Sequence, residues 1–289
     1  MKITGKVILY AVFTLFMVIV FLLFRFPSEM AVQLIDKQVN QLNSDVQVNT
    51  DSVSPIFPPG IKLEPLAVAY AGLPLFSADE FRIRPKLFSL FGDNKTIVFN
   101  GTMGTGQIKG NAETTIEATR PQAKVVLNLI AIPLEALQLS GYFPDYRPSG
   151  DINAYVDYDS RKGSGGTAKI NLDIVPVKIA IASPLMGLDM IEFNQLKAEL
   201  TATQRMLQIR RCEAEGPQFE GKLSGSIIFR NPIENSRLTI SCTLRPQPAF
   251  VAEHKNDLIG GLISSGNALK RGMVFRISGT LANPQYVMR

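Results

Sequence analysis

Residues Lys169–Val175 read KINLDIV, and this alternation of polar and apolar side chains decides the fold class. Successive side chains of a β-strand point to opposite faces, so Ile170, Leu172 and Ile174 would line one apolar face. Similar period-two stretches recur along the chain and are separated by turns rich in Gly, Pro, Asn and Asp. The pattern predicts about a dozen strands without regular βαβ alternation. The sequence therefore predicts a mainly β protein built on antiparallel sheet.

The apolar face of such a sheet must be buried against another sheet, against helices or against a ligand. Short helices are expected at Pro133–Leu139 and, weakened by its glycines, at Glu253–Lys270. These are too few to cover the strands. Two architectures therefore stay open, an elongated, curved sheet that forms an open groove and a closed β-sandwich.

An open apolar groove would suit acyl chains, because lipids are buried along their length by non-directional contact. In a closed sandwich the same side chains would be ordinary core. The candidate groove residues are Val125, Leu127, Leu129, Ile170, Leu172, Ile174, Leu207, Ile209, Leu238 and Ile240.

A membrane anchor is expected at Val7–Phe24, a segment without any charged residue. Its 18 residues, at about 1.5 Å each, would span about 27 Å as a helix, which matches the hydrocarbon core of a bilayer. A cleaved signal peptide is the alternative, but such peptides usually have a shorter apolar core followed by small residues. Lys2 and Lys6 precede the segment, which predicts a cytoplasmic N-terminus and an exported body.

Three regions follow from these patterns. Residues 1–26 form a cytoplasmic stub and transmembrane anchor, residues 27–43 a juxtamembrane helix, and residues 44–289 a β-rich domain. Ser28 can cap the juxtamembrane helix, and apolar residues recur in it at helical spacing.

The net charge of +5 is concentrated at the N-terminal end. Residues 1–26 contain three basic side chains and no acid, whereas the other 263 residues contain 27 basic and 25 acidic side chains. A basic stripe that would neutralise phosphates is therefore not expected, and nucleic acid is not a predicted partner.

The sequence contains little that suggests catalysis. Its single histidine, His254, stands in a polar segment and is expected to be exposed. Metal-binding spacings such as CxxC or HExxH are missing from the sequence, so neither a metal nor a cofactor is expected, and the protein is not predicted to be an enzyme. The glycine-rich run Gly101–Gly110 fits a twisted or bulged hairpin better than a phosphate-binding loop. Asp151, Asp157 and Asp159 are interpreted as strand-surface charges.

Cys212 and Cys242 are the only cysteines. An exported, oxidising location would allow a disulfide between them. Cys242 is in phase with Leu238 and Ile240, whereas Cys212 is out of phase with Leu207 and Ile209. A bridge would need a bulge at Arg210-Arg211 or another register, so a disulfide and two separate buried thiols both stay open.

Several short motifs carry a resemblance to a known family. They are the N-terminal anchor, Pro58–Leu63 (PPGIKL), Ile132–Leu137 (IPLEAL), Ser149–Ala154 (SGDINA), Gly221–Ile227 (GKLSGSI), Asn231–Leu238 (NPIENSRL) and Phe275–Pro284 (FRISGTLANP). In this order they resemble the type II secretion system protein N family, within the AsmA-like group.

The resemblance implies an inner-membrane protein that crosses the membrane once and has a periplasmic β-rich body with an AsmA-like groove. It implies contacts with secretion-system proteins, and kinship with proteins that carry lipid between membranes. The two functions to be weighed are therefore an accessory role in type II secretion and lipid carriage independent of secretion. The family pattern supplies no catalytic residue.

Overall fold

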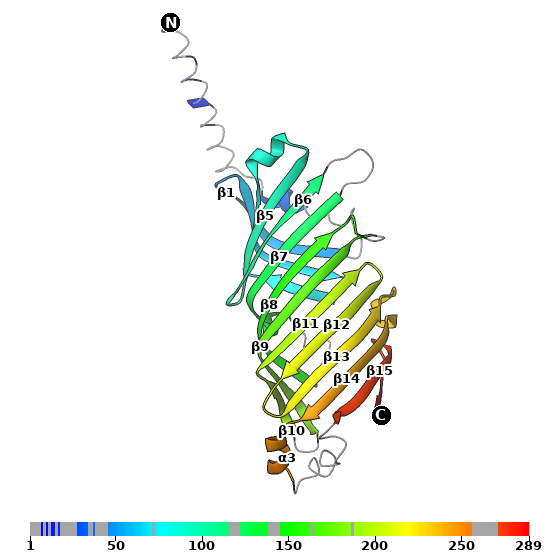
Figure 1. The fold of residues 1–289 in the computed structure, drawn as a ribbon. Coiled ribbons are helices and arrows are strands. Elements are labelled where there is room, and N and C mark those ends of the chain that lie inside the picture. Colours follow the sequence, from blue (N-terminus) through cyan, green and yellow to red (C-terminus); the bar gives the residue numbers. More distant parts are fainter. Residues whose placement is uncertain are drawn as a thin grey trace.

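A computed structural model describes residues 46–70, 73–115, 122–137, 145–162, 165–185, 188–255 and 271–288, together with 28–33 and residues 7, 10, 13, 14, 17 and 37. In this part of the chain a single antiparallel sheet of sixteen strands runs from Val46 to Met288 (Figure 1). The prediction of a mainly β, antiparallel fold is confirmed. Because every described strand belongs to this open sheet, the alternative of two packed sheets is wrong.

The strands follow one another in space almost as they do in the chain. The order in the sheet is β1-β2-β4-β5-β6-β7-β8-β9-β11-β12-β13-β14-β15-β16, with β3 paired to β2 and β10 paired to β9. Their bounds are β1 Val46–Ile56, β2 Gly60–Tyr70, β3 Leu73–Ala78, β4 Glu80–Pro85, β5 Asn94–Met103, β6 Gly106–Thr115, β7 Gln122–Pro133, β8 Tyr146–Asp159, β9 Thr167–Leu185, β10 Leu188–Phe193, β11 Gln195–Thr203, β12 Met206–Glu215, β13 Phe219–Ile228, β14 Arg237–Pro246, β15 Met273–Thr280 and β16 Pro284–Met288.

Two long strands each pair with two successive partners along one edge, which bends the sheet. The first half of β9 pairs with β11 and its second half with β10. In the same way β2 pairs first with β4 and then with β3. In Figure 1 the first strands pass behind β5–β8, so the sheet curves back at this end.

The buried core lies on the inner side of this curve. Val53 and Leu63 of the first two strands belong to one apolar cluster with Ile132 and Ile152 of β7 and β8. Phe193, Phe219 and Phe250 extend the cluster toward β10, and the rings of Phe219 and Phe250 lie 5.1 Å apart. The core therefore fills the region where the first strands, β10 and the short helices cover the sheet.

Four short helices are described in the body, namely η1 Leu87–Phe91, η2 Leu134–Leu137, η4 Ile233–Asn235 and α3 Pro248–Glu253. The helix predicted at Pro133–Leu139 forms as η2, with Leu134 buried. Most of the segment predicted at Glu253–Lys270 lies outside the described residues, and α3 ends where that prediction begins. Sequence reasoning did not predict η1.

The N-terminal predictions fall mainly on residues that are not described. Ser28–Gln33 are helical, and Ala31 and Val32 pack against the core, in agreement with the start of the predicted juxtamembrane helix. Val7, Tyr10, Phe13, Thr14 and Met17 are also helical and exposed, while the rest of the predicted anchor lies outside the described residues. Over the described residues no helix has the length and hydropathy needed to cross a membrane.

Candidate functional site

The register of the sheet places all ten predicted groove residues on one face. Leu127 pairs with Val156, Val156 with Ile170, and Ile170 with Leu200. The same cross-strand row continues through Ile209, Gly225, Ile240 and Ile277. The neighbouring rows contain Val125, Leu207 and Leu238 on one side and Leu129, Leu172 and Cys212 on the other. We call this surface the apolar face, because from β7 to β15 these three rows contain no charged side chain.

Part of the apolar face is core and part is not. Among the predicted residues Ile174 is buried in the core, and Leu127, Leu129 and Leu172 pack against it half-buried. Over the described residues, the others are not members of that core cluster. Val125, Ile170, Leu207, Ile209 and Ile240 are half-buried, and Leu238 is buried.

The structure adds members of the apolar face that the sequence pattern did not single out. They lie on β8, β11 and β13, between the strands that carry the predicted residues, and on β15 beyond them. All are half-buried and outside the core cluster: Val156, Leu200, Leu223, Ile227, Phe275 and Ile277. Their alternation was detectable, but it is diluted by alanine and glycine at neighbouring in-phase positions such as Ala154 and Gly225.

Two bulges keep the apolar face continuous where simple alternation fails. The pairing of β12 with β13 shifts between Ile209 and Cys212, and on the other side Leu200 pairs with Ile209 while Glu199 pairs with Arg211. The extra residue returns Cys212 to the side of Ile209 and leaves Arg210 and Arg211 exposed. A second shift, between Leu129 and Ile132 of β7, has the same effect.

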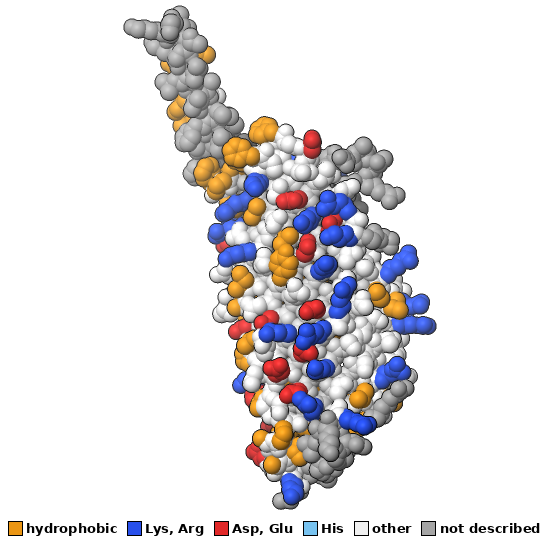
Figure 2. Space-filling view, in the orientation of Figure 1, with side chains coloured by type: hydrophobic (Ala, Val, Ile, Leu, Met, Phe, Trp, Pro, Cys, Tyr) orange, Lys and Arg blue, Asp and Glu red, His pale blue; other side chains and the backbone are white. Residues whose placement is uncertain are grey.

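The opposite face is polar, with basic and acidic side chains interspersed over its strands (Figure 2). It contains a hollow of about 920 Å³ over β6 to β12. Lys109, Lys197 and Arg211 line it together with Asp173, Glu199, Glu213 and Glu215. Arg211 and Glu213 are bridged at 2.6 Å, and Lys222 lies 3.4 Å from Glu213. The charges of this face therefore largely compensate one another.

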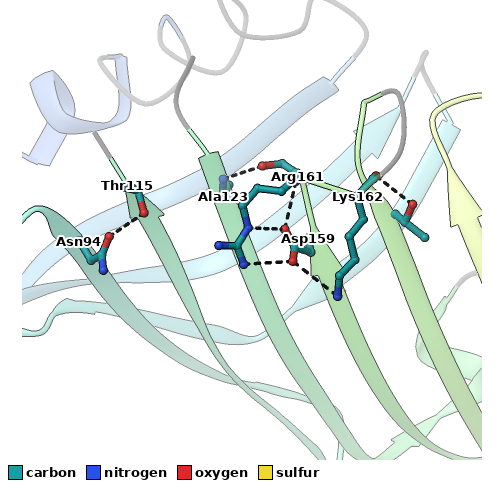
Figure 3. Close-up of polar contacts among 8 residues, drawn as sticks. Asn94, Thr115, Ala123, Asp159, Arg161 and Lys162 are labelled. Carbon is teal, nitrogen blue, oxygen red and sulfur yellow. Dashed lines mark hydrogen bonds and ion pairs between the residues drawn. The ribbon is translucent and has the colours of Figure 1, made fainter. Parts of the chain in front are cut away.

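Asp159, interpreted from the sequence as a surface charge, is in fact buried at the end of β8 (Figure 3). Its carboxylate accepts hydrogen bonds from the backbone N–H, Nε and Nη2 of Arg161 at 3.0, 3.0 and 3.1 Å, and Lys162 Nζ lies at 3.5 Å. These contacts, with the hydrogen bonds from Arg161 the largest cause, hold the pKa of Asp159 well below its usual range. The carboxylate thereby fixes the start of the β8–β9 connection.

Cys212 and Cys242 are both free and half-buried on the apolar face. Cys212 pairs with Leu223 and Leu223 pairs with Cys242, so the whole of β13 lies between them. Two strand spacings amount to about 10 Å, beyond the Cα separation that a disulfide tolerates. Burial raises the pKa of both thiols.

His254 is half-buried rather than exposed. It caps the C-terminus of α3, its Nδ1 lies 3.0 Å from the carbonyl oxygen of Phe250, and the two rings lie 4.2 Å apart. The described residues include no group of three or more His, Cys, Asp or Glu placed to hold a metal ion.

The glycine-rich run forms the β5–β6 hairpin, as expected, but its pairing is regular and contains no bulge. Gly104 has a φ of +56° in the turn, a conformation that glycine adopts without steric cost.

Comparison of the chain with protein-family models, with curated proteins and with solved structures returns no match.

Proposed function

We propose that the protein is a membrane-anchored lipid carrier or scaffold whose apolar face holds acyl chains. In this proposal residues 1–26 anchor the chain in the inner membrane and the sheet stands in the periplasm. The body is elongated, so an acyl chain bound along the sheet would extend away from the bilayer.

The observation that carries the proposal is that the apolar face is uncharged and yet only partly covered. Its rows run across eight strands, β7 to β9 and β11 to β15, without a charge, yet most of its side chains outside the core are only half-buried. Each methylene removed from water on such a surface is worth about 0.8 kcal/mol, so an acyl chain would bind favourably anywhere along it. The half-exposed aliphatic side chains of these rows cannot form hydrogen bonds, so they suit a lipid better than a polar substrate.

A role beside type II secretion is the second candidate, and it needs contacts with other proteins. The polar hollow supports it, because its mixed charges offer a surface that a complementary partner can recognise. The two roles can coexist, since they use opposite faces of the sheet. Crosslinking from Lys197 to secretion components in cells tests the second role.

Lipid binding is tested by comparing two variants that place the same charge on opposite faces. Ile209→Asp puts a carboxylate on the apolar face, whereas Gln208→Asp puts it on the exposed polar face next to it in the chain. Lipid retained per chain after purification in mild detergent is then measured by mass spectrometry. Lipid around the anchor is common to both variants, so a loss confined to Ile209→Asp supports the proposal, and equal retention contradicts it.

A further inference from the structure

Two neighbouring turns at one end of the sheet expose large apolar side chains. Phe88 and Phe91 of η1 are 90% and 93% exposed, Leu87 beside them is 46% exposed, and Phe57 in the β1–β2 turn is 79% exposed. Ile61 of β2 pairs with Ile83 of β4, so the turn before β2 and the helix after β4 lie at the same end. We call Phe57, Leu87, Phe88 and Phe91 the aromatic patch.

The aromatic patch is held in place by backbone and serine contacts. Ser89 Oγ donates to the carbonyl oxygen of Lys86 at 2.6 Å and accepts the N–H of Thr96 at 2.9 Å. Lys86 N–H also donates to Thr96 O at 2.9 Å, which ties the start of η1 to β5. Ser89, the polar residue of η1, thus faces the sheet, while Phe88 and Phe91 face outward. A helix that contacts only water would favour the reverse arrangement.

The surroundings of the patch suit a phospholipid surface. Arg84, Lys86 and Lys95 lie in the same segment against one acid, Asp93. At this end of the sheet Arg161 and Lys162 also present side chains that are 57% exposed, and the two share the single carboxylate of Asp159, so one positive charge remains in excess there. Exposed aromatic side chains at an end of the sheet that also carries basic ones match the apolar interior and anionic headgroups of a bilayer.

The N-terminal segment points to the same partner. Hydrophobic side chains gather at this end of the body (Figure 2). The described residues Val7, Tyr10, Phe13 and Met17 are helical, and all four expose apolar side chains. A bilayer that received this segment would face the aromatic patch.

We propose that the aromatic patch inserts into the headgroup region of the membrane and fixes the end of the sheet against the bilayer. This rests on the anchor in the proposed function, but not on lipid binding by the apolar face. The end of the apolar face would then open next to the lipid source.

Tryptophan fluorescence tests the insertion directly, because the natural chain contains no tryptophan. Phe88→Trp and Phe91→Trp are each introduced into the full chain, which is reconstituted into vesicles of phosphatidylethanolamine and phosphatidylglycerol. If the patch inserts, the tryptophan emission should be blue-shifted and should resist quenching by iodide. Its intensity should fall about twofold when the acyl chains carry bromine.

Two further reporters serve as matched controls. Tyr146→Trp, at the other end of the sheet and 48% exposed, should stay accessible to iodide and unaffected by bromine. Tyr10→Trp reports separately on the anchor and should be quenched by bromine. If the tryptophan at position 88 or at position 91 stays accessible to iodide, the proposal is overturned, whatever the Tyr10→Trp variant shows. A blue shift without bromine quenching also overturns it, since it would mean burial against protein.

Discussion

Cys212 of β12 and Cys242 of β14 face the same side of the sheet in one cross-strand row, with Leu223 of β13 between them. The bulge in β12 creates this alignment, because without the extra residue Cys212 would have the phase of the polar face. The pair therefore shows both how the apolar face stays continuous and why its two thiols do not join.

Alkylation will find two free thiols in every chain, whether or not reductant is present. After unfolding in denaturant, both cysteines should add label, and mass spectrometry should give the same mass shift in the two samples. In the folded chain labelling at neutral pH should be slow, because burial raises the pKa of each thiol and only the thiolate reacts. Protection that disappears only on adding reductant would contradict the strand order.

Gly110→Ala will destabilise the sheet. An added Cβ would lie 2.4 Å from the carbonyl oxygen of Val126 and 2.5 Å from the ring of Phe99, so β7 or the ring must move. We expect a loss of about 1–3 kcal/mol in the free energy of unfolding, measured by urea titration in mild detergent. Gly221→Ala is the control, since its Cβ would make ordinary contacts at 3.5 and 3.7 Å, and an equal loss there would refute the explanation.

Asp159→Asn will remove a pH-dependent part of the stability. The contacts of Asp159 lower its pKa in the folded state, so its contribution is complete above the unfolded pKa of about 4 and is lost as the pH falls through the folded value. Thermal unfolding should show a lower Tm for the variant than for the natural chain at pH 7. The difference between the two Tm values should narrow in acid. Asp151→Asn, an exposed carboxylate of the same strand, is the control. A gap that stays constant with pH would contradict the role of the carboxylate.

Ser89→Ala will loosen the connection that presents the aromatic patch. The change leaves the Thr96 N–H without its side-chain acceptor and removes the bond to Lys86 O. Such losses are worth about 1–3 kcal/mol locally, so chymotrypsin should cut at Phe88 or Phe91 several-fold faster in detergent. Unchanged cleavage would show that the serine does not hold η1.

The sequence was informative about faces and much less so about what covers them. Alternation at Ile170, Leu172 and Ile174 predicts their shared face, because every second side chain of a strand points the same way. That pattern is identical in a sandwich and in an open sheet, since it records which side is apolar and not what lies against it. The choice between them depends on strand order, which is set by long-range pairing.

Local exceptions were harder to predict. The bulge near Arg210 adds one residue without any glycine or proline to mark it, so alternation alone puts Cys212 out of phase with Ile209, and a bulge at Arg210-Arg211 is only one of the options that the sequence leaves open. Asp159 resembles the other strand aspartates in sequence, and only its contacts with Arg161 distinguish it. The exposed segment Leu87–Phe91 is apolar, and apolar composition alone does not reveal exposure.

The central claim, that the apolar face holds acyl chains, is tested most directly by photocrosslinking from two adjacent residues. A benzophenone amino acid replaces Ile240, which is half-buried on the apolar face, or Ser241, which is exposed on the polar face. The full chain is irradiated in native membranes, and the products are identified by mass spectrometry. The proposal predicts lipid adducts at residue 240 and none at residue 241, whereas products at residue 240 that join only parts of the protein itself would contradict it.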